Sequence, residues 1–229
     1  MLGWALSLIS LLRLDLHHLH WCSALLFVML RTQLQTGLFI VAHDAMHGLL
    51  WPNRQRCNDA IGAVLLALYA ALPYRRCLHN HRRHHRLPGS TLDPDFCPRR
   101  QAGVIRWYGH FMANYLTPTQ LLLLPALWAA LVLLLRPSTS TPAANVVLVC
   151  ILPLWLSSLQ LFIFGTYLPH RVQRDPSPAQ HPVSLDLPQW LSLLVCFHFG
   201  YHREHHDHPH LAWFELPSAR RLALASPAR

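Results

Sequence analysis

The sequence has no lysine and few acidic side chains. All 19 basic residues are arginine, Asp and Glu together number 10, and charged residues make up only 13% of the 229. A soluble domain carries about 25% charged residues. This deficit, together with 52% hydrophobic residues and a mean hydropathy of +0.23, excludes an ordinary soluble domain. We therefore expect residues 1–229 to form a single membrane-embedded domain.

Cysteines are also few, and they are widely separated. The chain has no Cys-x-x-Cys pair, which argues against a zinc ribbon and against a disulfide framework. We expect most thiols to be small apolar fillers in a reducing compartment. The six are Cys22, Cys57, Cys77, Cys97, Cys150 and Cys196.

The net charge of +9 does not indicate a nucleic-acid partner. A nucleic-acid interface needs a basic face on a polar chain, whereas these arginines flank long apolar runs. No nucleic-acid partner is therefore expected.

The apolar runs predict an all-α, integral membrane helical bundle. A helix needs about 20 mostly apolar residues to span a bilayer. Trp21–Ala42, Thr119–Leu135 and Ala144–Leu168 meet this requirement. Arg31 and two glutamines lie within the first of these runs, so we expect them to face protein or to extend toward the interface.

Three further apolar runs are too short to span. Leu2–Leu12 predicts an interfacial start, or the end of a first helix whose beginning is missing. Ala60–Pro73 predicts a re-entrant or interfacial segment, and Trp190–Phe199 leads directly into a cluster of histidines.

The arginines predict the orientation of the chain. Sixteen of the 19 lie in Asn53–Arg106 or Arg171–Arg229. Because basic loops remain in the cytoplasm, both stretches are expected there. We therefore predict a membrane protein with its histidine-rich segments facing the cytoplasm.

Three histidine boxes are the strongest functional signal. They read HDAMH at 43–47, HRRHH at 81–85 and HREHH at 202–206. On a helix, residues three and four apart share a face, and imidazole is the commonest metal ligand. A zinc site closes at four ligands, so eight imidazoles indicate two metal ions of the iron type. The expected ligands are His43, His47, His81, His84, His85, His202, His205 and His206, with His170 and His198 as further candidates.

Half of the acidic residues adjoin these boxes. Metal-bound imidazoles usually donate their second N–H to a carboxylate or a carbonyl. We expect five carboxylates to orient the ligands in this way: Asp44, Asp93, Asp95, Glu204 and Asp207.

Several stretches resemble a known family. HDAMHG (43–48), TLDPDF (91–96), SSLQLFIFGTYLPH (157–170) and FHFGYHREHHDHPHLAWFELP (197–217) are similar to the bacterial-type β-carotene ketolases of the membrane fatty-acid desaturase/hydroxylase superfamily. The resemblance extends from about Thr36 to Pro217. It implies a desaturase-like fold with a cytoplasmic di-iron cap built from the histidine boxes.

The resemblance also implies a reaction. The two irons would use O2 and electrons, expected from a ferredoxin, to hydroxylate the C4 methylene of a β-ionone ring twice. The geminal diol would lose water, so that β-carotene becomes echinenone and then canthaxanthin. In desaturases an asparagine four residues before the additional histidine helps to hold a metal through water. Thr166 stands at that place here, so this detail does not transfer.

An all-carbon substrate dissolved in membrane lipid requires an apolar tunnel. The aromatic residues expected to contact it are Phe164, Tyr167, Phe199, Tyr201 and Trp213. Trp107, Tyr108, Phe111 and Phe214 are weaker candidates. Interfacial packing is the alternative role for all of them.

Other functions share part of this pattern. A β-carotene 3-hydroxylase or a membrane fatty-acid desaturase would carry the same boxes. A metal-binding membrane protein or transporter without enzymatic activity would need polar residues through several spans, and Thr119–Leu135 and Ala144–Leu168 offer few.

Overall fold

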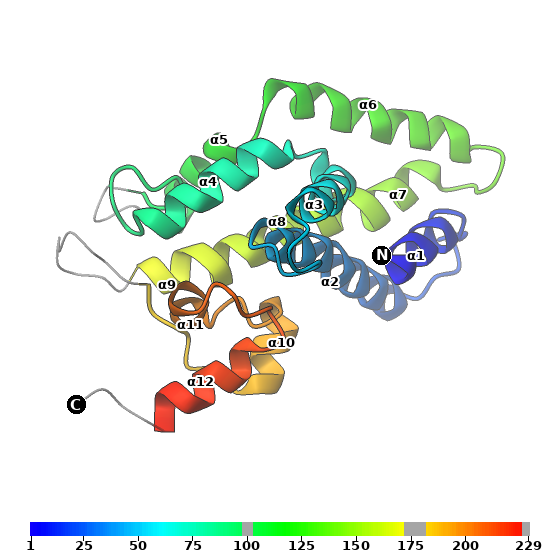
Figure 1. Cartoon of the computed structure of the whole chain (residues 1–229). Helices are drawn as coiled ribbons and strands as arrows, with labels where there is room; N and C mark the ends of the chain where they lie inside the picture. The colour runs from blue at the N-terminus through cyan, green and yellow to red at the C-terminus, as the bar shows by residue number, and fades with distance from the viewer. Residues whose placement is uncertain (98–102, 172–181, 226–229) are drawn as a thin grey trace.

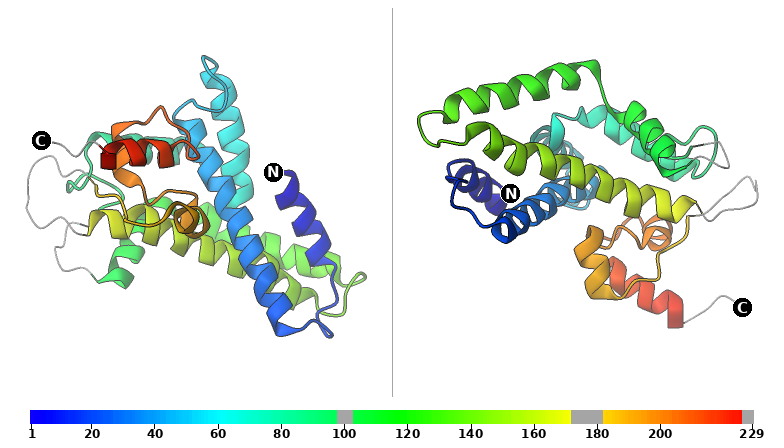
Figure 2. Two further views of the ribbon diagram at one scale, coloured as in Figure 1. Left: turned by 90° about the horizontal axis from the view of Figure 1, so that it is seen from below. Right: turned by 180° about the vertical axis from the view of Figure 1, so that it is seen from behind.

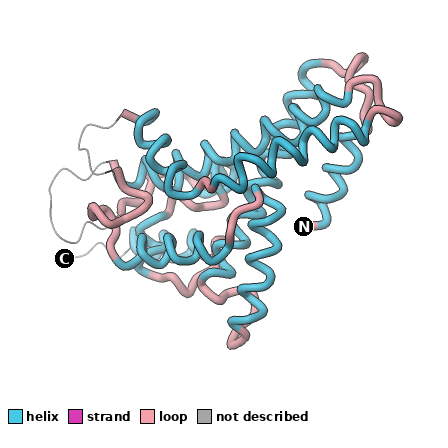
Figure 3. The backbone as a smooth tube through the Cα atoms, turned by 90° about the horizontal axis from the view of Figure 1, so that it is seen from above, coloured by secondary structure: helices cyan, strands magenta, loops and turns pink. Residues whose placement is uncertain are grey.

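The computed structural model describes residues 1–97, 103–171 and 182–225. Over these residues the chain is helical, with no strand (Figure 3), which confirms the all-α prediction. Three helical stretches are long and apolar enough to cross a membrane: Trp21–Met46, Pro118–Leu135 and Pro142–His170. They contain the three runs that the sequence predicts as spans.

The first two spans are single helices, and the third is composite. Helix α2 is Trp21–Met46 and α6 is Pro118–Leu135. The third span joins α7 (Pro142–Val146), α8 (Leu152–Leu161) and α9 (Leu168–His170) through two π-helical turns, Val147–Ile151 and Phe162–Tyr167.

Shorter helices complete the fold. They are α1 (Leu2–Leu12), α3 (Gln55–Ala70), α4 (Tyr74–Arg86), α5 (Val104–Tyr115), α10 (Gln189–Cys196), α11 (His202–Asp207) and α12 (Leu216–Ala225). Helix α1 packs against α2, and α2 and α3 lie side by side in Figures 1 and 2. Figure 1 places α4, α5, α9 and α11 at the end of the molecule opposite the loop that joins α6 to α7.

Helices α3 and α4 meet at a bend of 102°. Ala71 adopts a left-handed conformation with φ of 52°, and Pro73 follows, which cannot continue the hydrogen bonding of α3. Gly62 permits the bend, because a Cβ at this position would lie 2.3 Å from Cε2 of Tyr74. The first residue of α4 can therefore pack directly on α3.

Helix α6 begins at a capping box and faces outward. The side chain of Thr117 accepts a hydrogen bond from the backbone of Gln120, whose side chain accepts one from the backbone of Thr117. Pro118 suits the first helical position because its missing N–H would be unpaired there. Most of the α6 leucines are exposed, as expected for a helix in contact with lipid.

The polar residues of the spans bond to protein rather than to lipid. Arg31 is 1% exposed; its Nε donates to the carbonyl of Val149 at 3.2 Å, and Nη1 donates to the carbonyl of Trp4 at 2.8 Å and to Ser7 Oγ at 3.0 Å. Gln35 similarly donates to the carbonyl of Tyr69. Burial of Arg31 confirms that it faces protein, since an unpaired polar group in hydrocarbon costs several kcal/mol.

Candidate metal centre

The histidine boxes converge at the ends of three helices. Helix α2 contributes His43 in its last turn and His47 at its C-terminus, α4 contributes the second box, and α11 contributes the third. Their imidazoles form two groups, each with ligand atoms within 4.8 Å of one another. The first cluster is His43, His47, His81, His85 and His205; the second cluster is His84, His202 and His206.

The two clusters divide the histidine boxes in a regular way. Histidines four residues apart lie in the same cluster: His43/His47 and His81/His85 in the first, and His202/His206 in the second. The remaining histidine of each HxxHH box, His84 or His205, joins the other cluster. Both clusters therefore draw on α4 and α11, and these two helices link the two groups. The rings of His85 and His206 stack across the boundary at 4.2 Å between centroids.

Imidazole Nε2 atoms face one another in both clusters. Nε2 of His81 lies 2.7 Å from Nε2 of His47, and Nε2 of His85 lies 2.9 Å from Nε2 of His205. In the second cluster, Nε2 of His84 lies 2.9 Å from that of His206 and 3.2 Å from that of His202.

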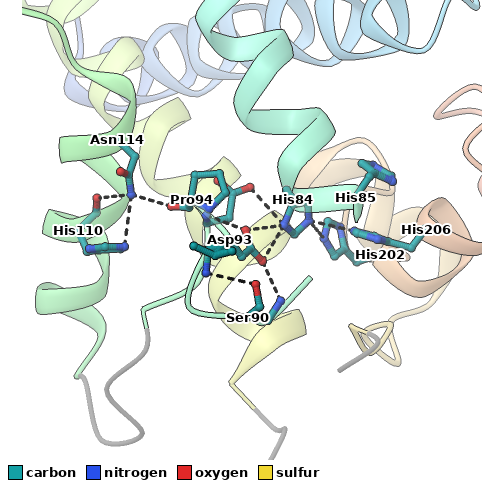
Figure 4. A network of polar contacts seen from close by, with 12 residues as sticks. His84, His85, Ser90, Asp93, Pro94, His110, Asn114, His202 and His206 are labelled. Atoms are coloured by element: carbon teal, nitrogen blue, oxygen red, sulfur yellow. Dashed lines mark hydrogen bonds and ion pairs between the residues drawn. The ribbon is translucent and has the colours of Figure 1, made fainter. Parts of the chain in front are cut away.

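Asp93 orients His84. Nδ1 of His84 lies 3.0 Å from both oxygens of Asp93 (Figure 4). Burial opposes ionisation of Asp93, yet the charge and the hydrogen bond of His84 hold its pKa below the usual value. An ionised Asp93 can only accept, so Nδ1 of His84 is the donor. Its Nε2 faces His202 and His206 of the second cluster, where a neutral His84 would present a lone pair to a metal ion.

Asp95 is a second, weaker neighbour of His84. Its Oδ2 lies 3.8 Å from Nδ1 of His84, and its Oδ1 accepts a hydrogen bond of 2.6 Å from the hydroxyl of Tyr115. Burial raises the pKa of Asp95 to about 6.

Helix α5 fixes the loop that carries both aspartates. The amide of Asn114 donates to the carbonyl of Pro94 at 2.8 Å (Figure 4), and Nε1 of Trp107 donates to the carbonyl of Asp95 at 2.8 Å. Asp93 closes the loop by accepting from the backbone N–H of Gly89 and of Asp95. The orientation of His84 thus depends on α5 as well as on α4.

The two additional histidines differ in their surroundings. His170 is 1% exposed, and neither of its ring nitrogens has a hydrogen-bond partner. Its ring lies 5.1 Å from those of His84 and His202, so it adjoins the second cluster. His198 belongs to neither cluster, and its ring stacks on Tyr201 at 5.6 Å. A φ of 63° places His198 in the turn between α10 and α11.

The other three carboxylates contact few imidazoles. Asp44 lies 3.8 Å from Nδ1 of His43 and accepts from the backbone N–H of Trp213 at 3.4 Å. Glu204 points away from the clusters and bonds to Arg220 at 3.0 Å and to Ser184. Asp207 forms an exposed ion pair with Arg203 on its own helix.

Burial favours the neutral form of the clustered imidazoles except at His84, where the charge and hydrogen bond of Asp93 outweigh burial and raise the pKa. It lowers the pKa of His47 to about 4, and it lowers the pKa values of His202, His205 and His206 well below the usual value near 6.5. Neutral imidazole is the form that binds metal. Together with the unpartnered nitrogens of His170, the convergence of lone pairs makes both clusters fit divalent metal ions of the iron, copper or zinc type.

An apolar cavity of about 370 Å³ leads away from the clusters. His43, His81, His84 and His202 line one end. Its walls then follow the third span from Thr166 to Ile151, a stretch of about 22 Å along the helix. Helix α6 forms the opposite wall, with Gln120, Leu124 and Trp128.

Five aromatic residues were expected to line a substrate tunnel. Phe199 lines the cavity and meets His43 edge-on at 4.7 Å between ring centroids, whereas Phe164, Tyr167, Tyr201 and Trp213 lie outside its lining. Tyr108 and Phe111 of α5 do line it. Sequence reasoning did not find Phe39, Tyr69, Trp128 or Trp155, which lie within the apolar stretches of α2, α3, α6 and α8.

Comparison with known proteins matches almost the whole chain. The fatty acid desaturase family model matches residues 16–136 and 114–228. A protein of Paracoccus sp. (strain PC1) named β-carotene ketolase is 43% identical over 83% of this chain and 76% of its own length. A second Paracoccus protein of that name, from strain N81106 / MBIC 01143, is 44% identical over 82% and 76%.

A more distant relative is named zeaxanthin 4-ketolase. It comes from Chlamydomonas reinhardtii and is 35% identical over 83% of this chain and 42% of its own length. No solved structure matches this chain. The extent of the family match, the three spans and the clustered histidine boxes lead to one conclusion: the chain belongs to the fatty acid desaturase family.

Proposed function

We propose that this protein is a di-iron oxygenase that converts the C4 methylene of carotenoid β-ionone rings to a ketone. The observation that carries the proposal is the apolar cavity that ends at both histidine clusters. A substrate made only of carbon and hydrogen can enter such a cavity from the bilayer. The Paracoccus relatives, named for their action on β-carotene, narrow the substrate class to carotenoids.

The first cluster would hold one iron through its five histidines. The second would hold the other through its three histidines and His170. The bound irons would supply the activation of O2. Two hydroxylations and loss of water balance as CH2 + 2 O2 + 4 electrons + 4 protons giving C=O + 3 H2O. A ferredoxin-type protein would deliver the electrons on the cytoplasmic side of the bacterial inner membrane.

The side chains of this chain would orient the reaction. Asp93 holds the imidazole of His84 so that Nε2 faces the second cluster. Phe199 and the apolar walls exclude water and hold the β-ionone ring beside the clusters.

Pigment analysis tests the proposal. Expression in bacterial cells that make β-carotene should yield echinenone and canthaxanthin, seen as a red shift in absorption and by chromatography. His84→Ala and His205→Ala should each abolish the ketones while the protein still accumulates in the membrane. Zeaxanthin alone would identify a 3-hydroxylase, and new double bonds in fatty acids would identify a desaturase.

A further inference from the structure

An arginine-lined groove lies on the outer face of α4, apart from the cavity described above. It has a volume of about 230 Å³ and is lined by Arg75, Leu78, His79, Arg82, Arg83 and Arg86. Arg75, His79, Arg82 and Arg86 are exposed and follow one another at intervals of four, three and four residues. This spacing aligns them as a stripe along one side of the helix.

The stripe has no counter-charge within the protein. No ion pair joins these arginines to a carboxylate in residues 1–97, 103–171 and 182–225. Helix α4 itself carries no acidic residue. The groove is therefore a surface of uncompensated positive charge, which attracts an acidic partner at long range.

The stripe is longer than a lipid headgroup layer is thick. Helix α4 starts beside the beginning of α6, where Nε2 of Gln120 donates to the carbonyl of Ala70 at 2.9 Å. From there it extends with α5 toward the side of the molecule that carries α9 and α11 (Figure 1). Arg86 lies about 16 Å beyond Arg75 along the helix, whereas the headgroup layer is about 5–7 Å thick. If α4 leaves the bilayer beside the start of α6 in this direction, lipid phosphates would reach Arg75 and not the distal arginines.

The opposite face of α4 carries three of the clustered histidines, namely His81, His84 and His85. A helix is about 10 Å in diameter with its side chains. A protein bound on the stripe would thus be separated from both clusters by the thickness of one helix. We propose that the arginine groove is the docking surface for an acidic one-electron carrier protein. This proposal rests on the proposed function, because formation of each ketone requires four electrons.

Charge reversal tests this surface directly. The protein would be placed in lipid nanodiscs with and without anionic phosphatidylglycerol, and binding of an oxidised, acidic [2Fe–2S] ferredoxin would be measured. Arg82→Glu combined with Arg86→Glu should weaken binding by roughly tenfold or more at low salt, and added salt should weaken wild-type binding. Arg82→Gln with Arg86→Gln should give an intermediate loss.

A matched control changes the same charge elsewhere. Arg13→Glu with Arg136→Glu alters two exposed arginines at the other end of the molecule and should leave ferredoxin binding unchanged. Iron content and thermal unfolding would establish that each variant is folded.

Equal ferredoxin affinity in the α4 reversal variant and in wild type would overturn the docking surface. A loss confined to discs that contain phosphatidylglycerol would also overturn it, by assigning the groove to lipid. Because binding is measured without turnover, a wild-type protein that docks ferredoxin through α4 and makes no ketone would contradict only the proposed function.

Discussion

Gly165 is expected to set the shape of the cavity beside the histidine clusters. It lies in the second π-helical turn of the third span, and both Gly165 and Phe199 line the cavity. A Cβ at position 165 would come within 2.6 Å of Cδ1 and 3.0 Å of Cε1 of Phe199. Ordinary carbon–carbon contact needs about 3.5–4 Å, so Gly165→Ala must displace the ring by about 1 Å.

The displaced ring has little free space. Phe199 is 8% exposed and already meets the imidazole of His43 edge-on. Overpacking of this kind costs about 1–3 kcal/mol in stability. A shift of about 1 Å beside the reacting atoms can lower a rate by up to about a hundredfold. We therefore expect Gly165→Ala to reduce ketone formation far more than it reduces the amount of folded protein.

The assay is the fraction of β-carotene converted in pigment-producing cells, with thermal unfolding measured in detergent. Phe199→Val removes both clashing atoms, Cδ1 and Cε1, so the double variant Gly165→Ala/Phe199→Val should recover conversion relative to Gly165→Ala alone. Gly109→Ala is the control, since a Cβ there meets nothing within 4 Å. Full conversion by Gly165→Ala, with an unchanged unfolding temperature, would refute the reasoning.

Four other outcomes follow from the same geometry. His170→Ala should lower the amount of iron bound per chain, because the unpartnered nitrogens of His170 adjoin the second cluster, whereas His198→Ala should retain the iron. Elemental analysis would distinguish the two variants, and equal iron content in both would contradict the assignment of His170 as a ligand. Asp93→Asn should weaken metal binding by about 10–100-fold through loss of the contact that orients His84, as measured by competition with a chelator. Arg31→Leu should destabilise the protein by about 2 kcal/mol or more, because it removes three hydrogen bonds from a charged group; an unchanged unfolding temperature would show that these bonds contribute nothing. Finally, burial lowers the pKa values of the three α11 histidines, so below about pH 6.5 the unfolded chain binds protons that the folded chain does not. The metal-free protein should then lose up to about 1.4 kcal/mol of stability per histidine for each pH unit, which thermal unfolding across this range would detect.

The sequence predicts the spans and the convergence of the boxes, but not how the histidines divide. Residues three and four apart both project from one helix face, so spacing alone does not show which of the two clusters His84 or His205 joins. That choice depends on how α4 and α11 cross. A carboxylate that lies next to a histidine box in the sequence need not contact an imidazole of the box. Asp93 contacts His84, whereas Glu204 pairs with Arg220.

The cavity lining is hidden from sequence for a different reason. A soluble helix marks its inner face by apolar residues at intervals of three and four. In α6 and α8 the outer face is apolar as well, because it meets lipid, so the inward position of Trp128 leaves no periodic signal. Phe199 could be anticipated because it lies within a histidine-rich segment rather than within a span.

The backbone of the third span departs from the α-helix at two places where its side chains make special contacts. A π-helical turn bonds each N–H to the carbonyl five residues back, which accommodates an extra residue and rotates the helix beyond it. The first turn includes Val149, whose carbonyl accepts a hydrogen bond from the buried guanidinium of Arg31. The second brings Gly165 against Phe199 and is followed by α9, which ends at His170. One span can thereby cross the membrane, accept a hydrogen bond from a buried arginine in its first third and present an imidazole at its end, because each turn rotates the helix beyond it.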